Sequence, residues 1–346
     1  MAAAACLPGA FAHSVIAQAA QPAAAPIACA KCHVGVATSY SHAPMRHALE
    51  SAGADPVLDA HPKLTVQMGS YAYTVQTKDG QSTYTVADGA DSMTLPVRWI
   101  FGQNSQTWVL EKDGNLYESL VSYFPGIGGL GTTPGDEKIT PHTLMEAMGR
   151  KLSPWETLQC FNCHATNATA GVKLTLDKLR PGLDCERCHE GVQQHMADAA
   201  HDNFNTLPKA LKTMSAGETA NFCGQCHRTW DTVVRNHWKG QADVRFQPYR
   251  LENSKCFAGN DARIGCLACH DPHQPLNHNA AFYDSKCLAC HSAAKVATAS
   301  TPTKSCPVSK VNCVSCHMPK VELPGGHALF TDHLIRVVHA GEAYPY

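Results

Sequence analysis

Cysteine and histidine recur in this 346-residue chain in one five-residue pattern, Cys-x-x-Cys-His. Seven copies are present, beginning at Cys29, Cys160, Cys185, Cys223, Cys266, Cys287 and Cys313. Two thiols three positions apart lie on one turn of helix, where each can form a thioether with a vinyl group of haem. The adjacent histidine can then bind the iron as its proximal ligand. The pattern therefore predicts seven covalently attached c-type haems, at positions that we call sites 1 to 7 in chain order.

Each predicted site contributes two attachment cysteines and one iron ligand. The attachment cysteines are Cys29, Cys32, Cys160, Cys163, Cys185, Cys188, Cys223, Cys226, Cys266, Cys269, Cys287, Cys290, Cys313 and Cys316. The proximal ligands are His33, His164, His189, His227, His270, His291 and His317.

Two other uses of paired cysteines fit this pattern less well. Structural zinc takes four ligands, so its Cys-x-x-Cys knuckles come in pairs and do not require a histidine after each one. A thioredoxin-like redox pair would occur once, beside a βαβ pattern. Random placement of the 17 cysteines and 20 histidines would produce about 0.05 copies of the full motif, so chance does not explain seven.

The elements that position these sites are expected to be short, since 21 prolines and 25 glycines indicate many turns and much of the core must be haem. We expect a mainly α and irregular multihaem cytochrome fold, with a small antiparallel β meander near residues 64–124. That meander is predicted by period-two alternation at Tyr71, Tyr73 and Val75 and by turn sequences such as Lys-Asp-Gly at 78–80. It contains neither cysteine nor histidine, so it is interpreted as a scaffold.

The chain is predicted to have four parts. Residues 1–26 are a presequence or flexible lead, 27–63 hold the first haem site, 64–135 form a β-rich insert and connector, and 136–346 form a haem-dense region with six sites. Attachment of c-type haem belongs to oxidising compartments outside the cytoplasm, and no apolar run approaches the length of a membrane span. We therefore expect a soluble periplasmic or extracellular protein.

Charge and motifs restrict the partners. The formal charge is -1, and ionised haem propionates would make the loaded protein acidic. No basic run is present, which disfavours nucleic acid, and no Gly-x-Gly-x-x-Gly follows a predicted strand, so flavin and nicotinamide cofactors are not implied. Redox partner proteins are the expected partners, with self-association into an oligomer or filament as a further possibility.

Six stretches of the chain resemble a family of heptahaem c-type cytochromes that is distantly related to the multihaem nitrogen-cycle cytochromes and hydroxylamine oxidoreductases. They are Pro-Met-Arg-His-Ala-Leu at 44–49, Cys-His-Asp-Pro-His at 269–273, Phe-Thr-Asp-His-Leu-Ile-Arg at 330–336, and those at 182–189, 222–230 and 245–251. The resemblance implies that distal iron ligands are supplied by His47, His195, His273, His327 and His333. For the two remaining haems the candidates are His42, His142, His237 and His278.

Two cysteines in the haem-dense region, Cys256 and Cys306, lie outside every motif, and in an oxidising compartment they are expected to pair as a disulfide. The leading hypothesis of function is electron transfer along seven haems, with an electron carrier favoured over an enzyme. The alternatives are an oxidoreductase with one open haem, acting on a small nitrogen or sulfur compound, and a subunit of an extracellular cytochrome filament.

Overall fold

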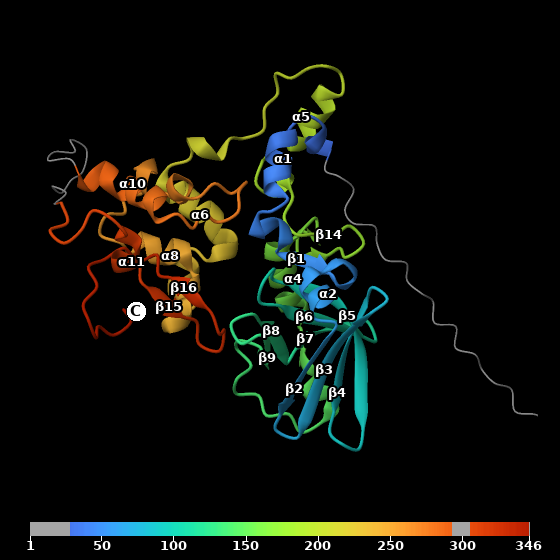
Figure 1. Ribbon diagram of the computed structural model, residues 1–346. Coiled ribbons are helices and arrows are strands. Elements are labelled where there is room, and N and C mark those ends of the chain that lie inside the picture. The colour runs from blue at the N-terminus through green and yellow to red at the C-terminus, as the bar shows by residue number, and fades with distance from the viewer. Residues whose placement is uncertain (1–27, 293–304, 346) are drawn as a thin grey trace, which may run out of the picture.

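The computed structural model describes residues 28–292 and 305–345, so the predicted presequence lies outside the described residues. Its largest element is an antiparallel sheet of eight strands in the order β10-β7-β6-β5-β4-β3-β2, with β1 paired to β5. The strands are β1 (Leu49–Ser51), β2 (Lys63–Met68), β3 (Tyr71–Lys78), β4 (Gln81–Ala87), β5 (Ser92–Phe101), β6 (Thr107–Lys112), β7 (Asn115–Ser119) and β10 (Gly149–Lys151). In Figure 1 this sheet forms the lower part of the molecule on one side.

Tight turns set the register of the sheet. Asp79 and Gly80 have φ values of 51° and 71° and connect β3 to β4 with Lys78 opposite Gln81. Asp113 and Gly114 repeat the same two values between β6 and β7. Two successive residues with positive φ form the hairpin turn whose twist matches that of the paired strands. The turn chemistry in the sequence therefore accounts for both hairpins.

The sheet has an aromatic core of its own. Trp108 is fully buried, and its ring centre lies 6.1 Å from that of Tyr84, which lies 6.2 Å from that of Tyr73. A second buried cluster contains Trp99 and Phe161, whose ring centres are 5.9 Å apart. Phe161 belongs to the site 2 motif, so this second cluster joins the sheet to the first haem site that follows it.

The α-helices of the described residues are short. They are α1 (Val34–Tyr40), α2 (Pro56–Ala60), α3 (Leu144–Met148), α4 (Pro154–His164), α5 (Val192–Ala199), α6 (Ala216–His227), α7 (Trp230–Arg235), α8 (Gln247–Glu252), α9 (Cys266–Cys269), α10 (Ala280–His291) and α11 (Cys313–His317). Capping boxes begin α4, at Ser153 and Glu156, and α6, at Ser215 and Glu218. Figure 1 shows α6, α8, α10 and α11 gathered on one side of the molecule, away from the sheet.

Small two-stranded sheets connect these helices. They are β8 (Val121–Phe124) with β9 (Gly129–Thr132), β11 (Ala165–Thr166) with β14 (Arg180–Pro181), β12 (Thr169–Ala170) with β13 (Lys173–Leu174), and β15 (Lys320–Glu322) with β16 (Leu329–Thr331). Within residues 28–292 and 305–345, the helices are all too short or too polar to cross a bilayer.

The predicted fold class is wrong. Helices hold 34% of the described residues and strands 24%, so the fold is mixed α and β rather than mainly α and irregular. The meander is also larger than expected, because β1 and β10 are recruited from outside residues 64–124 and pair with β5 and β7. Each of these two strands has three residues, which is too few to show a period-two pattern.

Candidate functional site

Every Cys-x-x-Cys-His motif lies on a helical turn. Sites 2, 4, 6 and 7 are the ends of α4, α6, α10 and α11, site 5 begins with α9, and sites 1 and 3 lie on the 3-10 helices η1 (Ala28–Lys31) and η4 (Cys185–Arg187). At site 1 the amide of His33 donates to the carbonyl of Cys29 at 2.8 Å. The equivalent bond is 2.9 Å at site 3 and at site 5. Such a turn directs both thiols toward one side, as two thioethers to one haem require.

The ring nitrogen Nδ1 is hydrogen-bonded to a backbone carbonyl in three motif histidines and in two predicted distal histidines. The pairs are His164 with Ala48 at 2.7 Å, His189 with Lys209 at 3.3 Å, His317 with Arg336 at 2.7 Å, His195 with Thr206 at 2.6 Å and His333 with Thr331 at 3.0 Å. A carbonyl can only accept, so Nδ1 carries the proton and Nε2 keeps its lone pair for a metal. These carbonyls belong to ordinary residues, and sequence reasoning had no signal by which to find them.

Three predicted proximal histidines each face a predicted distal histidine. The ring centres are 6.3 Å apart for His33 and His195, 5.9 Å for His189 and His273, and 6.1 Å for His270 and His333. A bond from metal to imidazole nitrogen is about 2 Å long, so two imidazoles on one iron have centres about 6 Å apart. The three pairs therefore fit one haem iron each.

Burial keeps several of these imidazoles in the neutral form that binds metal. Desolvation, with a further contribution from His270, lowers the pKa of His333 to about 4. Desolvation also lowers the pKa of His164, His227 and His270. A neutral ring does not have to release a proton before it binds iron.

The other predicted distal ligands lie elsewhere. His47 uses both ring nitrogens, with Nδ1 at 2.6 Å from a Glu50 carboxylate oxygen and Nε2 at 2.7 Å from the Ser41 carbonyl. His327 packs its ring against Phe124, with centres 5.0 Å apart. The four lower-ranked candidates, His42, His142, His237 and His278, are all exposed.

Thiols of different motifs lie close enough to interact. Hydrogen-bonded pairs are Cys29 with Cys185, Cys163 with Cys226, Cys223 with Cys266, and Cys287 with Cys313. Electrostatic interactions also link Cys188 to Cys223 and Cys269 to Cys287. These contacts connect site 1 to 3, 2 to 4, 3 to 4, 4 to 5, 5 to 6 and 6 to 7, so all seven sites form one connected set.

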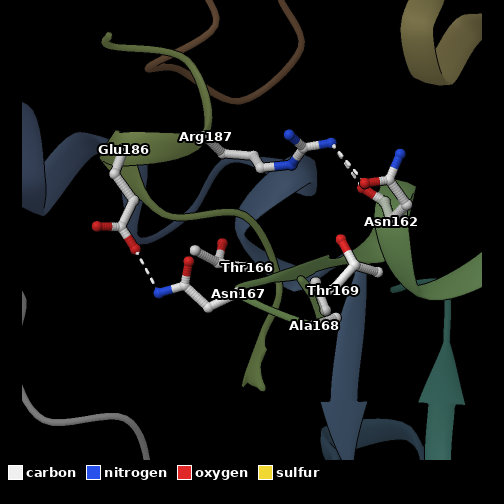
Figure 2. A pocket seen from close by; sticks show the side chains of 8 residues that line it. Asn162, Thr166, Asn167, Ala168, Thr169, Glu186 and Arg187 are labelled. Atoms are coloured by element: carbon white, nitrogen blue, oxygen red, sulfur yellow. Dashed lines mark hydrogen bonds between the residues drawn. The ribbon is translucent and has the colours of Figure 1, made fainter. Parts of the chain in front are cut away.

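A polar cavity of about 160 Å³ lies between sites 2 and 3. Figure 2 shows Arg187 of the site 3 motif directed at Asn162 of the site 2 motif, and its Nη2 donates to the Asn162 carbonyl at 2.7 Å. On the opposite wall Asn167 donates to the carboxylate of Glu186 at 2.9 Å. The residues between the two cysteines of each motif thus hold sites 2 and 3 together.

Cys256 and Cys306 are separate free thiols in the structure, so the predicted disulfide is not formed in it. Cys256 lies within electrostatic range of Cys287 and Cys290 of site 6. A disulfide between Cys256 and Cys306 stays a prediction.

A cluster of charge lies beside site 2, where Arg150 contacts three carboxylates. It is 2.6 Å from Glu118 and 3.7 Å from Asp136, and it also pairs with Glu156. Burial, followed by repulsion from Glu118, raises the pKa of Asp136 to about 6. The charged form of Asp136 therefore opposes folding.

We expect Asp136→Asn to change how stability depends on pH. Because the folded pKa of Asp136 is raised, its protonated form favours the folded state. The contribution of Asp136 to folding stability is present in full below its unfolded pKa of 3.8 and is lost as the pH rises through about 6. The stability of the variant relative to wild type should therefore rise by up to about 3 kcal/mol between pH 4 and pH 7. Urea unfolding at several pH values measures this. Asp177→Asn, at an exposed position, is the control, and a difference that does not change with pH would contradict the prediction.

Comparison with known proteins gives one family match. Residues 137–190, which include sites 2 and 3, match the family model of cytochrome c554 and c-prime. No curated protein and no solved structure is significantly similar to the chain. The match supports a c-type cytochrome with covalently bound haem and a part in electron transport.

Proposed function

We propose that the chain is a heptahaem electron-transfer protein that acts in the periplasm or outside the cell. One observation carries this proposal. In three places a histidine of a Cys-x-x-Cys-His motif faces a second histidine, with ring centres 5.9 to 6.3 Å apart. Haem iron supplies one-electron chemistry when it is bound, and its ligands and surroundings tune the potential.

Under this proposal, both axial ligands of the iron can be named for three of the seven sites. His33 and His195 hold site 1, His189 and His273 hold site 3, and His270 and His333 hold site 5. All three sites draw their two histidines from different parts of the chain. His195 follows the site 3 motif yet faces site 1, and His273 follows the site 5 motif yet faces site 3. Ligation would therefore tie site 1 to site 3 and site 3 to site 5, although these motifs are not consecutive in the chain.

The contacts between motif thiols support a continuous path for electrons. Because attachment thiols of different motifs lie close together, haems attached to them would lie close together as well. An electron carrier of this kind needs close spacing of its sites and no substrate pocket. We expect its partners to be redox proteins that exchange single electrons with it.

Ligand replacement at site 1 tests the proposal. The exported protein should carry seven haems by intact mass. His195→Met should leave that number unchanged and raise the midpoint potential of one haem, because thioether ligation stabilises the ferrous state relative to bis-histidine ligation. Potentiometric titration of the visible spectrum measures this, and His201→Met, at an exposed position, is the matched control.

The outcomes separate the proposal from its alternatives. A colourless exported protein, or identical potentials in both variants, would contradict it. A high-spin paramagnetic resonance signal that changes with nitrite, hydroxylamine or sulfite would favour an oxidoreductase. Fibres in electron micrographs of the secreted protein would favour a filament.

A further inference from the structure

The C-terminal segment is fixed to the rest of the protein by a buried ion pair. Arg250 is 2% exposed and Asp332 is 0% exposed. The guanidinium contacts both carboxylate oxygens, with Nε 2.8 Å from Oδ1 and Nη2 2.9 Å from Oδ2. A charged pair with so little water around it is maintained only where its remaining hydrogen-bonding capacity is also satisfied.

Two more donors complete the carboxylate of Asp332. Arg336 donates from Nη1 to Oδ2 at 2.8 Å, and the amide of Leu334 donates to Oδ1 at 3.1 Å. Each oxygen therefore accepts two hydrogen bonds, and three of the four come from charged groups. Charge-assisted bonds of this kind are short and directional, so Asp332 holds its neighbours in one arrangement.

One neighbour is a ligand of site 5. His333 follows Asp332 directly, and its ring faces that of His270 at 6.1 Å. Its carbonyl accepts from Ser254 Oγ at 3.3 Å, and the same hydroxyl accepts from the amide of Ile335 at 2.8 Å. Ser254 lies just after α8, which carries Arg250, so α8 fixes the backbone on both sides of His333.

The other neighbour orients a ligand of site 7. The carbonyl of Arg336 accepts from Nδ1 of His317 at 2.7 Å, and its amide donates to the His317 carbonyl at 3.2 Å. The side chain of this same Arg336 is bound to Asp332. The buried carboxylate of Asp332 thus helps to position a ligand at each of two different sites.

We propose that Asp332 is a positioning residue shared by haem sites 5 and 7, with Arg250 as its fixed anchor. The inference rests on the proposed function, because it assumes that His270, His333 and His317 bind iron. It assigns no contact between Asp332 and haem. Asp332 acts through the backbone of His333 on one side and through Arg336 on the other.

Asp332→Asn tests this in the exported protein loaded with haem. Asparagine has nearly the same volume as aspartate but no negative charge. Its amide NH2 is a donor, and it would face the N–H donors that now bind the Asp332 carboxylate. We expect intact mass to show seven haems, while paramagnetic resonance shows altered low-spin signals or new high-spin signals equivalent to two of the seven. Asp231→Asn is the matched control, since Asp231 pairs with Arg235 at 2.7 Å on an exposed helix surface.

A second variant keeps the inference testable if Asp332→Asn does not fold. Arg250→Lys retains the positive charge but cannot contact both oxygens, while the bond from Arg336 to Asp332 remains. It should alter the signal of one haem, site 5, and leave site 7 unchanged. Wild-type spectra in the folded variants would overturn the inference, as would equal changes at all seven haems. Protein without any haem would instead contradict the proposed function.

Discussion

Replacing both site 4 cysteines, Cys223 and Cys226, with serine is expected to leave six haems attached and to slow the redistribution of electrons within the molecule by orders of magnitude. Within residues 28–292 and 305–345, the thiol contacts between sites 1 to 3 and sites 5 to 7 run through site 4. Cys226 contacts Cys163 of site 2, and Cys223 contacts Cys266 of site 5. Without an acceptor at site 4, an electron has to cross a wider gap.

The measurement is a pulse of reducing radicals, too small to reduce every haem, followed by absorbance of the haem bands. In the site 4 variant we expect a slow phase whose rate does not depend on protein concentration. The control is the equivalent double replacement at site 2, Cys160→Ser with Cys163→Ser, which also removes one haem but leaves the contact between sites 3 and 4. The same slow phase in both variants, or in neither, would refute the proposed path.

The local chemistry of the sites was predictable because it is encoded within five residues. A motif such as Cys223 to His227 needs only one turn of helix to place its thiols and its imidazole, and that turn is present at the end of α6. The hairpin turns at Asp79 and Asp113 were predictable for the same reason, since two residues suffice to set their backbone conformation.

The pairing of histidines was not predictable from local pattern. The resemblance named His195 as a ligand, yet nothing near it in sequence shows that it faces His33, which lies 162 residues earlier. The same holds for the ion pair of Arg250 with Asp332, where neither residue differs locally from a solvated charge. Contacts between distant segments depend on tertiary packing, and the hydrophobic periodicity of a sequence predicts only local helices and strands.

The size of the sheet was underestimated because β1 and β10, with three residues each, are too short to show a period-two pattern. Within the sheet, Trp108, Tyr84 and Tyr73 form a buried cluster that contains no predicted haem ligand. A sheet with its own aromatic core can be stable where haem does not reach. This explains how a chain with seven predicted haem sites still holds 24% of its described residues in strands.

Trp108→Ala is therefore expected to destabilise the sheet while leaving the haem sites intact. Trp108 is 0% exposed and packs against Tyr84, so its removal leaves a cavity that the surrounding strands cannot fill. Truncating a buried tryptophan costs about 3–5 kcal/mol of unfolding free energy. Denaturant unfolding followed by far-ultraviolet circular dichroism should show this cost, whereas the haem spectrum in the absence of denaturant should match wild type.

Trp155→Ala is the matched control, because the same side chain at 65% exposure fills no core. Its expected cost is below about 0.5 kcal/mol. Equal costs for the two variants would contradict a separate core in the sheet. Loss of haem from Trp108→Ala would contradict it as well, because haem attachment would then depend on the sheet core, and the two could not be separate sources of stability.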